Sequence, residues 1–209
     1  MSVIKDPGTY FCAMIDLPEK TGAKALIFDL DGTLANTMEV HYEAYKKVTD
    51  TYGIDFSRQL FYDWAGTPTI TTFERLKEMY QLEDMDPVDC TLRKRENFKK
   101  NFHLVNRIEP VFDIVREWHG KLPMSIGTGS SRQMGMKTIE TLHMTPYFDH
   151  IITVDDVSKG KPDPETFAKC ALLMGVETSD CLVFEDGEPG IVAARALDMK
   201  IVDVREYLS

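Results

Sequence analysis

The sequence predicts an α/β protein built on an open parallel sheet, with a small all-helical domain inserted after the first strand. Two observations predict this fold class. Five short apolar runs, each ended by polar or turn-forming residues, alternate with segments of helical spacing over most of the chain. Such alternation is typical of strands that are buried on both faces and joined by crossover helices. The stretch 36–109 breaks the alternation and has helical spacing throughout.

The apolar runs are the expected strands, and the polar residues that follow them are the first candidates for a functional site. A helix is expected after the third strand, because Asp163-Pro164-Glu165 is typical of a helix start and Gly175 of a helix end. Ligands of open parallel sheets bind at the carboxyl ends of the strands. The five strands are expected at 24–28, 123–128, 150–154, 181–184 and 200–204.

The segment after the first strand is predicted to be a separate helical cap. Helices are expected from Met38 to Tyr52, from Thr71 to Tyr80 and from Val88 to His103, with Gly66-Thr67-Pro68 as an interruption. The hinges are expected near Asn36-Thr37 and Arg107-Pro110. We therefore expect a core domain of residues 1–35 and 110–209 and a cap domain of residues 36–109.

Composition excludes several kinds of partner. The chain has 209 residues and a formal net charge of −10, and a nucleic-acid or anionic-membrane partner would call for a basic face. No apolar run approaches the roughly 18–20 residues that cross a bilayer, and the first residues do not resemble a secretory signal. Cys12, Cys90, Cys170 and Cys181 lack metal-ligand spacing and are expected to be reduced thiols. We expect a cytoplasmic protein, monomeric by default because nothing in the sequence indicates an oligomeric state.

The residues at four strand ends form one chemically coherent set. Carboxylates gathered at one sheet edge repel one another unless a cation joins them, and all-oxygen ligands of this kind suit Mg²⁺. A lysine, a threonine hydroxyl and the backbone N–H groups of a glycine-serine turn suit the oxygens of a phosphate. Each piece alone is more often a cap, a turn or a surface charge; their order and placement together indicate function. The set comprises Asp29, Asp31, Thr128, Gly129, Ser130, Lys161, Glu185 and Asp186.

These residues resemble the motifs of the haloacid dehalogenase superfamily. The run Asp29-Leu30-Asp31-Gly32-Thr33-Leu34 resembles its first motif, and Thr128, Lys161-Pro162 and Glu185-Asp186 match its second, third and fourth. The resemblance extends from about Ala23 to the end of the chain. The helical insert is similar to the cap of the β-phosphoglucomutase-like branch. Within that branch, segments such as Gly127-Thr128-Gly129-Ser130 and Ala193-Ala194-Arg195-Ala196 resemble bacterial fructose-1-phosphatases.

The resemblance implies a fold, a reaction and a set of residue roles. The fold is a Rossmann-like core with a helical cap, and the reaction is Mg²⁺-dependent hydrolysis of a small phosphorylated sugar. Asp29 would be the nucleophile and Asp31 the general acid and base. Mg²⁺ would be held by Asp29, the Asp31 carbonyl and Asp186, with Glu185 acting through water. Thr128, Gly129, Ser130 and Lys161 would bind the phosphate, and His41 and Thr69 of the cap would face the substrate.

Other interpretations remain open at this point. A sugar-phosphate mutase is the main alternative, although Asn36 and Thr69 stand where the mutase has an aspartate and an arginine. A phospho-signalling receiver uses similar groups but carries its phosphorylated aspartate on a later strand. A dehalogenase would need neither Asp31 nor a metal. His41 could also be a surface histidine. The basic run Arg93-Lys94-Arg95 with Lys99-Lys100 is interpreted as a solvated helix face, with Lys94 or Arg95 as a substrate anchor in the alternative.

Overall fold

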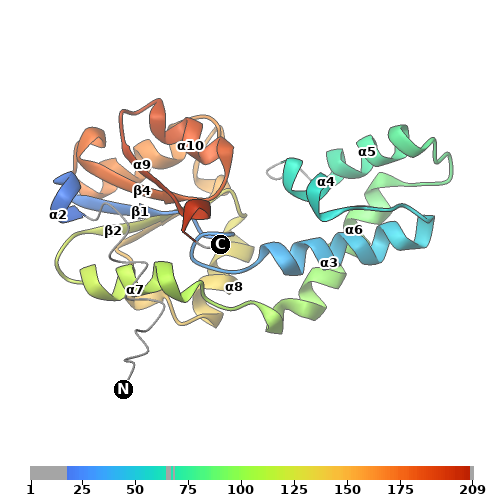
Figure 1. Cartoon of the computed structure of the whole chain (residues 1–209), viewed down its shortest axis with the longest axis horizontal. Helices are drawn as coiled ribbons and strands as arrows, with labels where there is room; N and C mark the ends of the chain where they lie inside the picture. The colour runs from blue at the N-terminus through green and yellow to red at the C-terminus, as the bar shows by residue number, and fades with distance from the viewer. Residues whose placement is uncertain (1–17, 65–66, 68, 208–209) are drawn as a thin grey trace, which may run out of the picture. The chain divides into compact units, whose positions relative to one another are not determined.

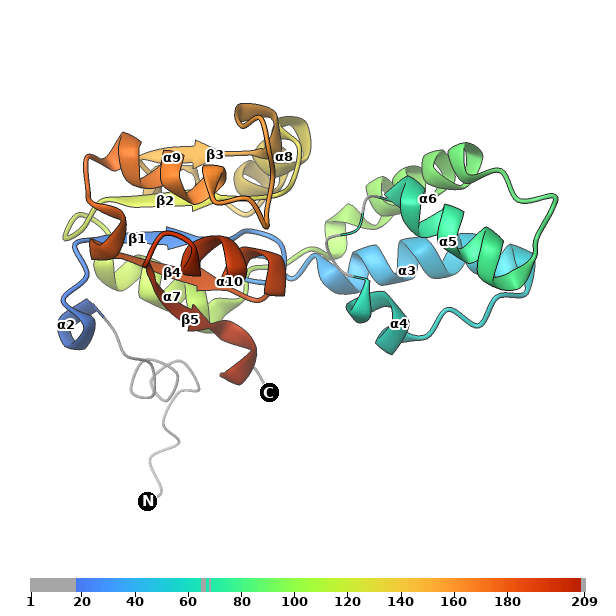
Figure 2. The same ribbon diagram turned by 90° about the horizontal axis from the view of Figure 1, so that it is seen from above.

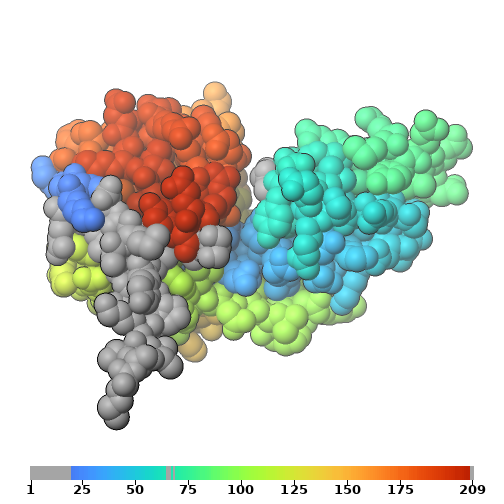
Figure 3. Space-filling view, in the orientation of Figure 1, coloured from blue at the N-terminus to red at the C-terminus, as the bar shows by residue number. Residues whose placement is uncertain are grey.

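The computed structural model describes residues 18–64, 67 and 69–207 of the chain. The chain forms two compact units, one of residues 1–36 and 106–209 and one of residues 37–105. We call them the core unit and the insert unit. In Figure 3, the orange and red residues lie in the core unit and the cyan residues lie in the insert unit.

The core unit contains a five-stranded sheet in which every neighbouring pair of strands is parallel. The strand order is β3-β2-β1-β4-β5, so the first strand lies at the centre. β1 and β4 are buried along their whole length, as expected for apolar strands covered on both faces. The strands are β1 (Ala25–Phe28), β2 (Met124–Gly127), β3 (His150–Ile152), β4 (Cys181–Glu185) and β5 (Lys200–Asp203).

Helices cover both faces of this sheet. The chain moves outward from β1 to β3, returns to the other side of β1 and continues to β5; because crossovers are right-handed, the helices before and after this return lie on opposite faces. Figure 1 shows α9 and α10 on one face and α7 on the other. The helices of the core unit are α2 (Pro18–Thr21), α7 (Glu109–Trp118), α8 (Arg132–Thr141), α9 (Glu165–Met174) and α10 (Glu188–Arg195), with 3₁₀ turns at Thr145–Tyr147, Val154–Asp156, Thr178–Asp180 and Val204–Glu206.

The insert unit is entirely helical in its described residues. Its core is aromatic: Tyr42, Tyr45, Phe56, Phe61 and Phe73 pack together around fully buried Leu76. Figure 2 shows α6 running along α3 and α5. Its elements are α3 (Met38–Thr49), a 3₁₀ turn (Asp50–Tyr52), α4 (Arg58–Asp63), α5 (Thr69–Tyr80), α6 (Pro87–Asn101) and a 3₁₀ turn (Phe102–Leu104).

The predicted fold class, a parallel sheet with a helical insertion after its first strand, is confirmed. Two local details differ from the expectation. A separate short helix, α4, begins after Ser57, whose side chain accepts a hydrogen bond from the Leu60 N–H. The third strand is shorter than expected, because Thr153 caps the 3₁₀ turn Val154–Asp156. Among the described residues, no helix combines the length and apolar character needed to cross a membrane.

Candidate active site

The carboxyl ends of β1 and β4 form the point at which the strand order reverses. Phe28 of β1 pairs with Phe184 of β4, and their rings stack at a centroid distance of 4.6 Å. The Asp29 N–H donates to the Phe184 carbonyl over 2.9 Å. The two strands therefore end side by side, and Asp29 emerges next to Glu185 at the place where open parallel sheets bind ligands.

Lys161 joins these two strand ends. Its ammonium lies 2.6 Å from Asp29 Oδ1 and 2.7 Å from Glu185 Oε2, and all three side chains are nearly buried. The Asp186 and Gly187 N–H groups donate to Glu185 Oε1. Burial by itself would lower the pKa of Lys161, but the Asp29 and Glu185 carboxylates outweigh it and raise that pKa above the usual lysine value. Lys161 is therefore a permanent cation in this site.

Asp186 contacts the loop that follows β1. Its Oδ1 accepts a hydrogen bond of 3.0 Å from the Thr33 hydroxyl. Gly32 has a φ of +96°, and a Cβ at that position would lie 2.2 Å from Asp186 Oδ2. Only glycine allows this close approach of the loop to the carboxylate. Thr33 was not singled out in the sequence, although it stands in the same short motif as Asp29.

The acidic side chains raise one another's pKa values. Burial, followed by the charge of Glu185, raises the pKa of Asp186 to about 7. Burial raises the pKa of Asp29 well above its ordinary value, and the charge of Glu185 adds to this effect despite Lys161. A site with these properties favours either an added proton or an added cation.

Three of the four predicted carboxylates fit a metal ion. Oxygen atoms of Asp29, Glu185 and Asp186 lie within 4.8 Å of one another. Hard carboxylate oxygens at a sheet edge, with one ammonium opposite three acids, are ligands of the kind that Mg²⁺ prefers. The Asp31 carboxylate is not in this group of three, which leaves its main-chain carbonyl as the contribution that we predicted from the sequence.

Asp31 instead faces the loop after β2. The Ser130 hydroxyl donates to Asp31 Oδ2 over 2.6 Å, and the Ser130 N–H donates to Thr128 Oγ1 over 3.0 Å. Thr128 is fully buried, and its N–H donates to the Ile152 carbonyl. Gly129 is exposed between them. The loop of residues 128–130 thus reaches Asp31 from the neighbouring strand.

In the insert unit, His41 and Lys94 form a pair. His41 Nδ1 lies 2.8 Å from the Lys94 ammonium, and its ring stacks on Phe98 at 4.1 Å. Since an ammonium only donates, Nδ1 accepts and the ring is neutral at this geometry. Burial, and then the charge of Lys94, lowers the pKa of His41 well below its usual value.

The interpretation of the basic run as a solvated helix face was wrong for one of its members. Lys94 is only 5% exposed, and its ammonium lies 4.7 Å from the centre of the Tyr45 ring, whereas Arg95, Lys99 and Lys100 are exposed. The reason is helical spacing: Lys94 lies midway between Cys90 and Phe98 on the buried face of α6.

Thr69 does not belong to a loop, as the sequence suggested, but is the first residue of α5. Burial raises the pKa of the Tyr45 hydroxyl above its usual value, and hydrogen bonds with Thr69 and Thr72 offset part of this rise. Thr69 and Lys94 therefore both contact Tyr45 in the insert unit. Gly66 and Pro68 of the predicted cap motif are outside the described residues.

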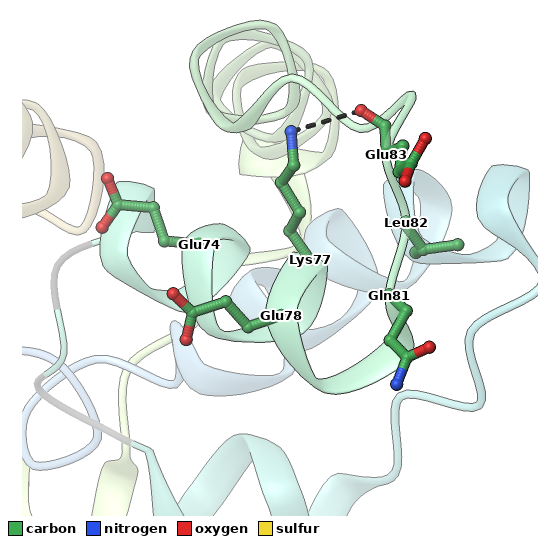
Figure 4. Close-up of a pocket in the computed structure, with 6 residues that line it drawn as sticks. All are labelled: Glu74, Lys77, Glu78, Gln81, Leu82 and Glu83. Carbon is green, nitrogen blue, oxygen red and sulfur yellow. Dashed lines mark hydrogen bonds between the residues drawn. The ribbon is translucent and has the colours of Figure 1, made fainter.

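A surface hollow of about 510 Å³ in the insert unit carries none of the predicted residues. Figure 4 shows Glu74, Lys77 and Glu78 of α5 beside Gln81, Leu82 and Glu83 of the following turn. Lys77 donates to the carbonyls of Glu83 and Met85, so its role there is to close the turn. This hollow is not a candidate active site.

Comparison with known proteins agrees with the fold and the motifs. The family model described as haloacid dehalogenase-like hydrolase matches residues 26–204. The chain is 38% identical to the fructose-1-phosphate phosphatase YqaB of Escherichia coli, over 86% of this chain and 95% of that protein. It is 28% identical to a phosphorylated carbohydrates phosphatase of Thermotoga maritima, over 83% and 81% of the two chains.

Comparison with solved structures shows that the chain shares its fold with known proteins. The crystal structure of a β-phosphoglucomutase from Clostridium difficile superposes with a TM-score of 0.69 at 20% identity, covering 89% of this chain and 97% of that one. The chain belongs to the haloacid dehalogenase-like hydrolase family. The resemblance given by the motifs is confirmed, as is the prediction of an enzyme.

Proposed function

We propose that the chain is a Mg²⁺-dependent phosphatase that hydrolyses small sugar phosphates of the fructose 1-phosphate kind through an aspartyl-phosphate. Two relatives named for phosphatase activity, one on fructose 1-phosphate and one on phosphorylated carbohydrates, support the substrate class. The observation that carries the reaction is the arrangement at the β1 end, where Asp29 contacts Lys161 and Asp31 contacts Ser130.

Asp29 is the nucleophile in this proposal. Its carboxylate attacks phosphorus and forms an aspartyl-phosphate, which divides one difficult displacement into two easier steps. Asp31 protonates the departing sugar oxygen and then takes a proton from the water that hydrolyses the intermediate. The hydrogen bond from Ser130 keeps the Asp31 side chain in one orientation for both transfers.

The neighbouring groups bind the phosphate and the metal. Lys161, the Thr128 hydroxyl and the Gly129-Ser130 turn hold phosphate oxygens, since all can donate hydrogen bonds at the same sheet edge. Asp29, Asp186 and the Asp31 carbonyl would hold Mg²⁺, and Glu185 would support it through water. When bound, the ion neutralises charge on the transferring phosphoryl group.

His41 and Thr69 complete the proposal as substrate-binding residues of the insert unit, and Lys94 joins them as the alternative anchor that the sequence left open. A cation beside a neutral histidine suits sugar hydroxyls and phosphate oxygens. We also propose a cytoplasmic location; the free thiols of Cys90, Cys170 and Cys181 are consistent with a reducing compartment.

A mutase would need a fixed cation for the phosphate that is not reacting, and an arginine suits this task best. Thr69 stands at that position and cannot neutralise a dianion. Hydrolysis is therefore expected, unless Lys94 supplies the charge.

The test is phosphate release in Mg²⁺ across a panel of sugar phosphates that includes fructose 1-phosphate and β-glucose 1-phosphate. The second substrate is supplied with a trace of the 1,6-bisphosphate, and glucose 6-phosphate is followed beside free phosphate. Glucose 6-phosphate forming much faster than free phosphate would overturn the phosphatase in favour of the mutase. No release from any sugar phosphate would overturn both.

A further inference from the structure

The turn that follows β3 forms hydrogen bonds with residues 130–132, which include part of the candidate phosphate-binding loop. Thr153 and the 3₁₀ helix Val154–Asp156 lie beside the start of α8. The Val154 N–H donates to the Ser130 carbonyl over 3.2 Å. Two residues later in the loop, the Arg132 N–H donates to Asp155 Oδ2 over 2.9 Å. The turn therefore holds the segment Ser130–Arg132 at both of its ends.

An ion pair between Arg132 and Asp156 also joins the turn to the start of α8. Nη2 of Arg132 lies 2.6 Å from each carboxylate oxygen of Asp156. Asp156 Oδ2 also accepts from the Thr153 N–H at 2.8 Å and from the Thr153 hydroxyl at 2.7 Å. From α9, the Lys169 ammonium donates to the Asp156 carbonyl over 2.6 Å. Asp156 is thus fixed by fully buried Thr153 and in turn fixes Arg132.

We propose that Arg132 and Asp156 are positioning residues that hold Ser130 against Asp31, an inference that rests on the proposed function of this site. Ser130 links the turn after β3 to Asp31: its carbonyl accepts from the Val154 N–H, and its hydroxyl donates to Asp31. The Arg132 side chain hydrogen-bonds to Asp156, and the Asp156 side chain hydrogen-bonds to Arg132 and Thr153, so both lie one residue or more behind the groups that face Asp31. They act by fixing the path of the loop, and hence the direction of the Ser130 hydroxyl.

Stability is a poor explanation for the Arg132 end of this pair. The Arg132 side chain is 50% exposed and that of Asp156 is 21% exposed, and ion pairs of this kind contribute about 0–1 kcal/mol to folding. Burial opposes ionisation of Asp156, but the hydrogen bonds from Arg132 and Thr153 prevail and lower its pKa to about 2. The carboxylate therefore stays charged and in place throughout the working pH range.

The experiment compares Arg132→Met and Asp156→Asn with the wild type, alone, together and in a Ser130→Ala background. Asp180→Asn is the matched control, because Asp180 forms an exposed ion pair with Lys24 at the opposite ends of the strands, with a side chain 29% exposed. We expect each variant of the pair to lower kcat/KM for the best sugar phosphate by about tenfold, within the roughly 100-fold that a misplacement near 1 Å can cause. In Arg132→Met, which removes the half-exposed end of the ion pair, the midpoint of thermal unfolding should fall by less than about 4 °C.

The coupling separates positioning from a general structural role. The double variant Arg132→Met with Asp156→Asn should be no worse than either single variant, and each single variant should reduce activity by a smaller factor in the Ser130→Ala background than in the wild-type chain. Losses that multiply with that of Ser130→Ala would overturn the inference, as would activity equal to that of Asp180→Asn.

Amide hydrogen exchange tests the same inference without turnover. In Arg132→Met and Asp156→Asn, exchange at residues 129–131 should accelerate by about tenfold or more, with no change in Asp180→Asn. Unchanged protection of these amides would overturn the inference even in an active enzyme. A wild-type chain that released no phosphate would overturn the proposed function instead, and the exchange rates would still decide whether the pair holds the loop.

Discussion

The core unit and the insert unit each bury a cluster of titratable side chains, and the two clusters have opposite electrostatic character. At the sheet edge, three carboxylates face one ammonium, so negative charge is in excess, and burial together with the charge of Glu185 raises the pKa values of Asp29 and Asp186. In the insert unit, the Lys94 ammonium lies against a neutral imidazole and two aromatic rings, and the pKa of His41 is lowered.

The difference shows what each cluster can bind. An anionic cluster that resists its own ionisation gains most from a hard cation, whereas a buried cation among rings gains most from an anion or a polar ligand. The first is suited to chemistry on phosphorus and the second to recognition. Substitutions in the core unit should therefore change kcat, while substitutions in the insert unit should change KM.

The largest effect is expected when the nucleophile is replaced. Asp29→Asn should abolish phosphate release and any trapped aspartyl-phosphate, because an amide oxygen is a poor nucleophile. Asp31→Asn should retain a slow reaction, lowered by roughly 10²–10⁴-fold because both proton transfers lose their catalyst. Rapid-quench labelling with a radioactive sugar phosphate measures both. Near-normal turnover of Asp29→Asn would show that Asp29 is not the nucleophile.

A second large effect is expected from Gly190→Ala in α10. A Cβ there would lie 1.9 Å from Glu185 Oε2, so the Glu185 side chain would have to leave Lys161 or the helix would have to move. Gly135→Ala in α8 is the matched control, because its Cβ would meet Thr128 only at 3.7 Å. We expect the apparent Mg²⁺ affinity of Gly190→Ala to fall by about 10–100-fold, measured from the Mg²⁺ dependence of kcat. Equal Mg²⁺ affinity in the two variants would count against Glu185 as a metal-supporting residue.

The core unit could be predicted largely from the sequence, because its signals are local. Buried strands are continuous apolar runs, and the residues that follow them, such as Asp29 and Thr128, are placed at one edge by the parallel topology alone. Thr33 and Arg132 were missed because a hydroxyl or a surface arginine acquires its role only from a partner more than twenty residues away in sequence.

The insert unit was harder to predict because its signals conflict. The basic run that contains Lys94 indicates a solvated face, while the spacing of Cys90, Lys94 and Phe98 indicates a buried one. Burial wins because the Lys94 ammonium has His41 as a hydrogen-bond partner and lies over the rings of Tyr45 and Phe98. Thr69 was assigned to a loop because it directly follows the run Gly66-Thr67-Pro68, which the sequence marks as an interruption.

A smaller effect is expected from Lys94→Met. If the buried ammonium contacts the substrate, the variant should raise KM by about tenfold or more and leave kcat within a factor of about three, because uniform binding is lost. Arg95→Met is the matched control, being the exposed neighbour on the same helix. Initial rates over a range of fructose 1-phosphate concentrations measure both constants. A fall in kcat with unchanged KM would contradict the expectation that substitutions in the insert unit change KM and those in the core unit change kcat.

The smallest effect concerns the stability of the insert unit below neutral pH. Because the pKa of His41 is lower in the folded chain than in the unfolded one, the unfolded chain binds more protons in the window between the two values. Stability from His41 is therefore fully present above about pH 6.5 and is lost as the pH falls from there through the folded pKa. One proton limits the slope to about 1.4 kcal/mol per pH unit.

The measurement is urea unfolding of the wild type, followed by amide exchange in α3 and α6, at several pH values between 7.5 and 5. His41→Gln should remove this part of the pH dependence, while His103→Gln, an exposed histidine of the same unit, should keep it. Lys94→Met should keep a reduced part, because burial, the larger cause of the lowered pKa, remains. Identical pH profiles for the wild type and His41→Gln would show that folding does not lower the pKa of His41.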